Sequence, residues 1–163
     1  MVRAFVGVLV CAVFGALFVA APVESQVGLD PFEGVVVHVP PVDGSVIDPF
    51  RPPAQPWLPG NRGLEYETED GQPVRGSADG FVTFAGQVGG DLFVTVRHAD
   101  GIRTTVGFLA EIHVAAGETV QQGTLLGTAA ESIHFTARRG DTYFDPELLF
   151  VAVEYFVRLI PAV

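Results

Sequence analysis

One short stretch of the chain carries residues that could do chemistry: Ser132-Ile133-His134-Phe135. Successive side chains of a β-strand point to opposite faces, so this stretch would place Ser132 and His134 on one face and Ile133 and Phe135 on the other. An imidazole on such a face could be a metal ligand. The plainer interpretation is a histidine at the edge of the core, hydrogen-bonded to Ser132 or to Glu65.

The overall charge restricts the partners of such a site. The chain has nineteen acidic residues against nine basic ones, all arginine, and a formal net charge of −10. This acidity argues against a nucleic-acid partner, because phosphates demand a basic surface. The absence of lysine excludes mechanisms that need a lysine amine.

The N-terminus predicts export. Residues 4–23 are apolar without interruption and only Arg3 is charged before them, the pattern of a signal peptide. We expect residues 1–25 to be a signal peptide cleaved after Ser25; the alternative is an uncleaved anchor, because about 20 apolar residues can span a bilayer. Membrane contact is expected only through this segment, if it is uncleaved. The single cysteine, Cys11, lies inside it, so no disulfide is expected in the mature protein.

The remaining elements predict an all-β domain. Residues 26–59 read as a linker and a proline-rich arm, since seven prolines between residues 40 and 59 prevent helix and central strand alike. Short β-rich runs then follow at about ten-residue spacing, which indicates an antiparallel sandwich or barrel-like sheet. They are residues 81–85, 91–97, 102–109, 119–126 and 132–138.

Turn and helix signals punctuate these runs. Asp100-Gly101 is a strong hairpin signal, because glycine accepts the positive φ of a tight turn. Residues 139–141 mark a second turn. Residues 145–158 predict a C-terminal helix that begins near Pro146.

Five short sequence motifs occur in an order that resembles that of the lysostaphin-like (LytM-like) zinc metallopeptidases. They are Pro41-Val42-Asp43-Gly44-Ser45-Val46, Pro59-Gly60-Asn61-Arg62-Gly63-Leu64-Glu65, Gly76-Ser77-Ala78-Asp79-Gly80-Phe81-Val82, Val114-Ala115-Ala116-Gly117-Glu118-Thr119-Val120 and Ser132-Ile133-His134-Phe135. The resemblance covers roughly residues 40–150. It implies the family's sheet, a duplicated hybrid motif, over residues 60–150, with residues 151–163 as a helical tail.

The resemblance also implies a zinc site, most of which has been replaced. Family members hold one zinc ion with a histidine, an aspartate four residues later and the last histidine of a His-x-His pair, and two further histidines move protons. Here Asn61, Glu65 and His134 stand at the ligand positions, so zinc would be weakly held or absent. Phe108 and Ser132 stand at the two proton-transfer positions, which leaves no catalytic residue.

These observations favour two functions and exclude a third. The resemblance implies an exported protein of the cell envelope that binds peptidoglycan or regulates a wall hydrolase, since degenerate relatives activate division amidases. The alternative is a residual zinc metalloendopeptidase cleaving peptidoglycan cross-links, with a substitute base such as His113. Residues 114–127 also resemble the strands of lipoyl and biotinyl carriers, but those carriers need a lysine. His98 and His113 are expected to be surface or turn residues, and His38 to be remote from catalysis.

Overall fold

The computed structural model describes residues 36–55 and 57–150 of the chain. The predicted leader and the predicted tail, residues 1–25 and 151–163, lie outside the described residues. In the described part, no helix has the length and apolar character that a membrane span requires.

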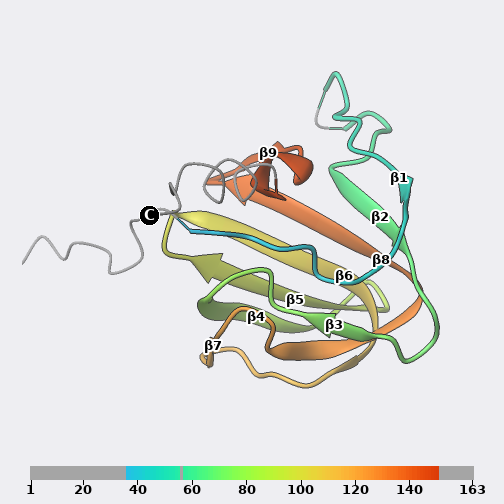
Figure 1. Ribbon diagram of the computed structural model, residues 1–163. Coiled ribbons are helices and arrows are strands. Elements are labelled where there is room, and N and C mark those ends of the chain that lie inside the picture. Colours follow the sequence, from blue (N-terminus) through green and yellow to red (C-terminus); the bar gives the residue numbers. More distant parts are fainter. Residues whose placement is uncertain (1–35, 56, 151–163) are drawn as a thin grey trace, which may run out of the picture.

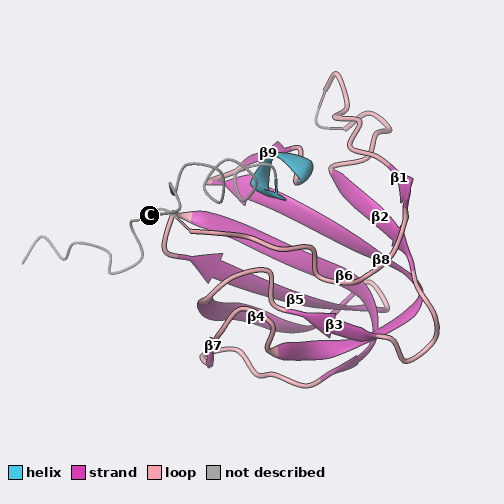
Figure 2. Cartoon of the chain, in the orientation of Figure 1, coloured by secondary structure: helices cyan, strands magenta, loops and turns pink. Residues whose placement is uncertain are grey.

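Strands make up most of the described structure, with one short helical turn at residues 147–150 (Figure 2). The strands are β1 (Val46–Asp48), β2 (Gly63–Glu67), β3 (Pro73–Arg75), β4 (Gly80–Val88), β5 (Asp91–His98), β6 (Ile102–Ile112), β7 (Thr119–Val120), β8 (Leu125–Arg139) and β9 (Thr142–Phe144). The helical turn starts where the C-terminal helix was predicted.

All strand pairs are antiparallel, as predicted. The main order is β1-β2-β8-β6-β5-β4-β7, and β3 and β9 also pair with β8. The 15-residue strand β8 is therefore the centre of the sheet, with β2 and β6 on its two sides. The sheet is open, with β1 and β7 at its two ends. It is also strongly bent (Figure 1).

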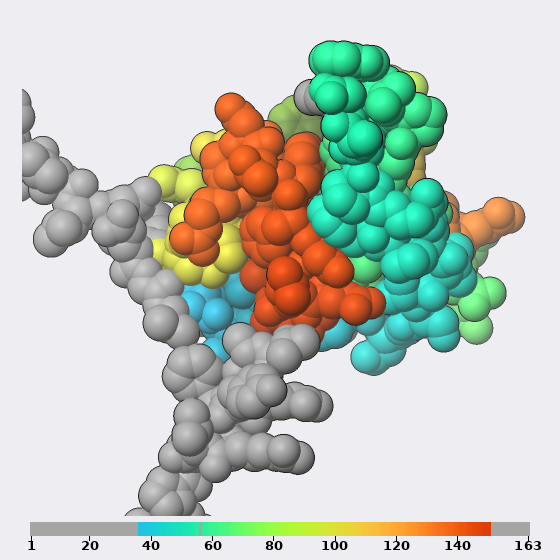
Figure 3. Space-filling model, turned by 90° about the horizontal axis from the view of Figure 1, so that it is seen from above, coloured from blue at the N-terminus to red at the C-terminus, as the bar shows by residue number. Residues whose placement is uncertain are grey.

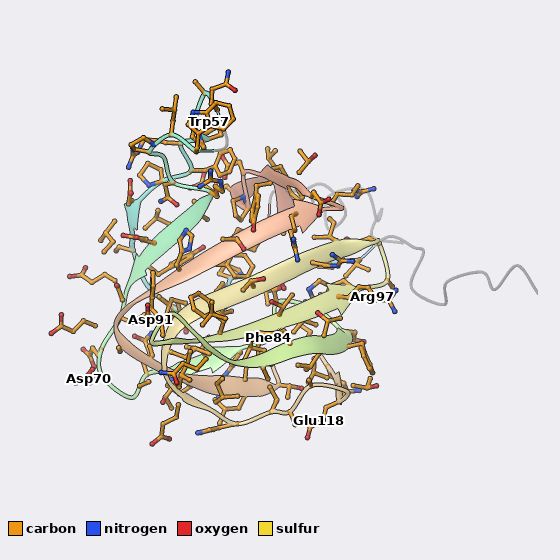
Figure 4. The ribbon with its side chains drawn as sticks, turned by 180° about the vertical axis from the view of Figure 1, so that it is seen from behind. Trp57, Asp70, Phe84, Asp91, Arg97 and Glu118 are labelled. Carbon is orange, nitrogen blue, oxygen red and sulfur yellow. The ribbon has the colours of Figure 1, made fainter. Side chains whose placement is uncertain are left out.

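One face of the sheet carries the core. Val96 in β5, Val106 in β6 and Phe135 in β8 are fully buried on this face, following the period-2 alternation of strands. The segment of residues 36–45 runs across the same face (Figure 1) and contributes the buried Val42. The opposite face, seen in Figure 4, has no such cover from this segment, and we call it the open face.

The predicted hairpin at Asp100-Gly101 is confirmed, with Gly101 at φ 77° between β5 and β6. One strand prediction was wrong. Residues 119–126 were expected to be a single strand, but β7 ends at Val120 and β8 begins at Leu125. Gly123 has φ 81° in the turn between them, a backbone conformation that glycine adopts readily and that ends a strand.

The expectation that His98 is a surface or turn residue was also wrong. His98 is completely buried, and its ring meets the buried His38 ring edge to face at 4.7 Å. Its Nδ1–H donates to the Asp79 carbonyl at 2.9 Å, and its Nε2 accepts from the Thr104 hydroxyl at 2.7 Å. Burial without a negative partner in contact lowers the pKa of His98 to about 4, so the ring is neutral at pH 7.

His38 ties the N-terminal segment to the hairpin. Its Nε2 lies 3.0 Å from Asp100 Oδ2, and its Nδ1 lies 3.2 Å from Ser77 Oγ. Asp100 also accepts the Ile102 N–H through Oδ1 at 3.0 Å. One aspartate of a tight turn therefore both closes the turn and holds the segment that crosses the core.

Candidate functional site

His134 lies in the second half of β8, on the open face. Its cross-strand neighbours are Glu65 of β2 and Gly107 of β6. Ile133 and Phe135 are completely buried on the other face, so the predicted alternation is confirmed. Ser132 lies opposite Glu67. Glu65, Glu67, Glu69 and Asp70 form an acidic run, a pattern typical of a solvated loop. Glu65 and Glu67 instead belong to β2, in which the alternate residues Leu64 and Tyr66 are buried.

Asn61 lies against His134, directly before β2. Asn61 Oδ1 is 2.8 Å from His134 Nε2, and the same oxygen accepts the Gly63 N–H at 3.0 Å. The Asn61 amide nitrogen donates to the Asp48 carbonyl at 3.1 Å, which fixes which end of the amide faces the ring. Because Oδ1 can only accept, His134 donates from Nε2.

The charge of His134 follows from its surroundings. Burial lowers the pKa of His134 below its ordinary value, while the carboxylates of Glu65 and Asp48 partly oppose that shift. Asp48 is itself paired with Arg51, at 2.8 Å from each carboxylate oxygen. The imidazole is therefore neutral at pH 7 and carries its proton on the nitrogen that faces Asn61.

The donor atoms around His134 fit zinc poorly. Structural and catalytic zinc ions take cysteine, histidine and carboxylate ligands, and no group of three such residues occurs within residues 36–55 and 57–150. Asn61 offers only an amide oxygen, and both of its lone pairs are already used by His134 and Gly63. A metal ion bound by Asn61 and by Nε2 of His134 would have to break the hydrogen bond between them.

Phe108 stands beside this pair, in a bulge of β6. The pairing of β6 with β8 shifts between Gly107 and Leu109, and Phe108 has φ 63°, the left-handed region that bulky residues rarely adopt. Its ring lies 6.0 Å from the His134 ring and 5.9 Å from the Phe93 ring. The bulge thus turns an aromatic ring toward the imidazole.

Gly107 permits this arrangement because it lets the Phe93 ring lie close to the β6 backbone. A Cβ atom at Gly107 would collide with the ring of Phe93, so Phe93 lies flat against the β6 backbone. Phe93 was not among the predicted site residues, although its period-2 position opposite Gly107 was a signal for it.

The backbone strain at Phe108 yields a prediction. We expect the free energy of unfolding of Phe108→Gly to exceed that of Phe108→Ala by about 1 kcal/mol, because glycine has no Cβ atom that is strained at φ 63°. Both variants lose the same ring, so the comparison isolates the backbone. Urea denaturation would measure the difference, and equal stabilities would show that the bulge relaxes in solution.

The rings of Phe93 and Tyr143 and the His134 imidazole border a pocket of about 240 Å³. It is lined by Arg62, Phe93, Thr105, Gly107, His134, Thr136 and Tyr143. A larger hollow, of about 560 Å³, lies between residues 43–45 and 67–72. That hollow holds carboxylates and backbone but no imidazole, so the smaller pocket is the better candidate for a functional site.

His113, the expected substitute base, lies away from His134. His113 is bonded to Glu111 at 3.2 Å and follows β6, six residues beyond Gly107, or roughly 20 Å of extended strand. It is therefore no substitute base for His134. Trp57 is 78% exposed on the loop of the proline-rich arm, which protrudes from the domain (Figures 3 and 4).

Comparisons with known proteins agree with this architecture. The model of peptidase family M23 matches residues 59–146, more than half of the chain. The structure of the antimicrobial peptidase lysostaphin from Staphylococcus simulans superposes with a TM-score of 0.62 at 18% identity, covering 75% of this chain and 57% of that one. This likeness shows the fold.

Curated relatives match over shorter stretches. The DD-carboxypeptidase/endopeptidase Mpg of Neisseria meningitidis is 36% identical over 84 residues, which cover 47% of this chain and 19% of Mpg. The cell division protein DipM of Caulobacter vibrioides is 36% identical over 95 residues, covering 52% of this chain and 15% of DipM. The chain therefore spans less than a fifth of the length of these two relatives.

Proposed function

The chain belongs to peptidase family M23, and we propose that it is an exported protein of the cell envelope that binds peptidoglycan or a wall hydrolase without cutting the wall itself. The hydrogen bond between Asn61 and His134 is the observation that carries this proposal. It joins two residues at expected zinc-ligand positions and occupies Oδ1 of Asn61 and Nε2 of His134.

The surroundings of His134 support the same conclusion. Peptide hydrolysis by a zinc enzyme needs an activated water and a nearby group that moves protons. Phe108 is the nearest ring on β6 and cannot accept a proton. Ser132 has a hydroxyl but no basic nitrogen. What the site retains is a pocket with aromatic and hydroxyl groups, and such pockets bind ligands without chemistry.

The names of the relatives favour the cell wall as the place of action. Mpg is named for carboxypeptidase and endopeptidase activity and DipM for cell division. An exported member that binds wall material or a wall enzyme is consistent with these names. The apolar segment of residues 4–23 is typical of a signal peptide and supports export.

Zinc analysis of the purified full chain would test the proposal. We expect far less than one zinc ion per chain, the same content in His134→Ala, and no release of wall fragments from purified peptidoglycan by either protein. Zinc at one ion per chain in the wild type, lost in His134→Ala together with wall cleavage, would contradict the proposal.

That contrary result would favour the second candidate, a residual zinc metalloendopeptidase. One observation speaks for it: Glu65 lies directly across from His134, so a carboxylate and a neutral imidazole do face one another. Changing Glu65→Gln should then lower the zinc content as His134→Ala does, whereas Glu67→Gln, two residues along β2, should not.

A further inference from the structure

The open face carries a row of three arginines that the expected site does not include. Arg97 of β5 lies directly opposite Arg103 of β6, and Arg103 lies directly opposite Arg138 of β8. Phe81 and Tyr143 stand at the two ends of this row. Directly opposed residues point to the same face of a sheet, and strands lie about 4.8 Å apart. We call Arg97, Arg103 and Arg138 the arginine row.

Placing these charges side by side costs stability, because like charges directly opposite one another repel. The row also gathers three of the nine basic residues of a chain whose net charge is −10. Arg138 reaches Asp141 only at 4.0 Å, and that aspartate is fully exposed. For Arg103 no ion pair is found within the described part of the chain. Arg103 and Arg138 therefore have cationic capacity that the described residues leave largely unused.

A pocket adjoins the row. Arg103 and Arg138 form part of the lining of a hollow of about 400 Å³, whose other walls are Thr83, Phe84, Val88 and Thr95. Phe84 and Val88 are 39% and 56% exposed, so the hollow offers apolar walls beside two guanidinium groups. Figure 4 looks onto this side of the sheet, with Phe84 and Arg97 labelled.

A row of threonines connects this hollow with the pocket at His134. Thr95, Thr105 and Thr136 lie opposite one another on three adjacent strands, between the arginine row and His134. Thr95 and Thr105 share a hydrogen bond of 2.9 Å between their hydroxyls. Arg103 precedes Gly107, the neighbour of His134, by four residues, so about 13 Å of open face separates the arginine row from His134.

We propose that the arginine row binds a free carboxylate of a cell-wall peptide, which lies across the threonine row with its other end at the His134 pocket. Guanidinium groups bind carboxylates through two parallel hydrogen bonds. Threonine hydroxyls can bond peptide amides, and Phe84 and Val88 can contact short aliphatic side chains. The span of about 13 Å matches roughly four residues of extended peptide. This inference rests on the proposed function, because it names the ligand of a groove that does not cut.

The test compares two ligands and two arginine variants on the full chain, kept soluble in a non-ionic detergent. The ligands are a fluorescent synthetic wall stem peptide with a free C-terminal carboxylate and the same peptide as its C-terminal amide. We expect the wild type to bind the free acid about tenfold more tightly than the amide, the usual contribution of a charge-assisted pair.

The double variant Arg103→Gln, Arg138→Gln should bind the free acid about tenfold more weakly and the amide as the wild type does. Arg139→Gln is the matched control, because Arg139 is an exposed neighbour that points to the other face, and it should leave both affinities unchanged. Since the two ligands are compared on the wild type as well, the test does not depend on the variant being folded.

Equal affinity of the wild type for acid and amide would overturn the inference, as would tight binding of a phosphate-rich wall polymer in place of the peptide. Sedimentation with purified peptidoglycan separates this failure from that of the proposed function. Unchanged sedimentation of the double variant would refute the arginine row alone, whereas a wild type that neither sediments nor alters a wall hydrolase would refute the proposed function too.

Discussion

Restoring the missing imidazoles should convert the chain into a zinc protein. We expect the double change Asn61→His, Glu65→Asp to raise bound zinc from a trace to about one ion per chain, since it supplies two histidines and a carboxylate around one point, the ligand set that leaves zinc an open position. The physical reason is visible in the wild type, where the Asn61 amide oxygen touches His134 Nε2 at 2.8 Å.

The second pair of changes separates binding from chemistry. Phe108→His with Ser132→His, made without the ligand changes, should bind no zinc, while all four changes together should add wall hydrolysis to zinc binding. Elemental analysis and release of soluble wall fragments would give the two readouts. A double ligand variant that stays metal-free would show that the β2 backbone holds its side chains too far from His134.

Acid should destabilise the fold through its buried histidine. The pKa of His98 is about 4 in the folded chain, against 6.5 for an ordinary histidine. The unfolded chain therefore binds more protons between these values, so stability is greatest above pH 6.5 and falls as the pH decreases toward 4. The expected loss of free energy of unfolding between pH 7 and pH 4 is about 3 kcal/mol.

Urea denaturation across that range would measure the slope, with His98→Gln as the variant that removes the titration. A glutamine side chain can replace the hydrogen bonds to the Asp79 carbonyl and to Thr104. The free energy of unfolding of the His98→Gln variant should therefore vary far less between pH 4 and pH 7 than that of the wild type. Asp100 contributes only at the acid end of this window. Burial opposes the shift, but the hydrogen bonds from His38 and from the Ile102 N–H lower the pKa of Asp100, so most of its contribution is lost at still lower pH. The pKa of His134 is lowered by burial as well, so part of the slope remains in His98→Gln, and a slope as steep as that of the wild type would contradict the assignment.

Local patterns were enough to predict the central strands. The alternation in residues 91–97 and 102–109 and the Asp100-Gly101 turn predicted β5 and β6 with their connection, because hairpin register depends only on neighbours in sequence. The strand β2 was missed because its glutamates, read alone, indicate a solvated loop. Its place in the sheet is decided by β8, some 70 residues later.

Parts of the site could have been predicted and others could not. Arg97 and Arg103 are equally distant from Asp100, so the hairpin alone places them opposite one another. The hydrogen bond of Asn61 with His134 and the burial of His98 beside His38 depend on tertiary packing. The sequence pattern offers no signal for them, since a histidine next to a turn is ordinarily exposed.

The central position of β8 also governs when the domain can fold. Strands β2 and β3 have their main hydrogen-bond partners in β8, which is synthesised about 60 residues after them. Pairings so distant in sequence form slowly, and until residues 125–139 are available β2 can pair only with β1, and β3 lacks its partner. The hairpins of β4, β5 and β6 can form earlier, but the sheet is completed only when β8 inserts between β2 and β6.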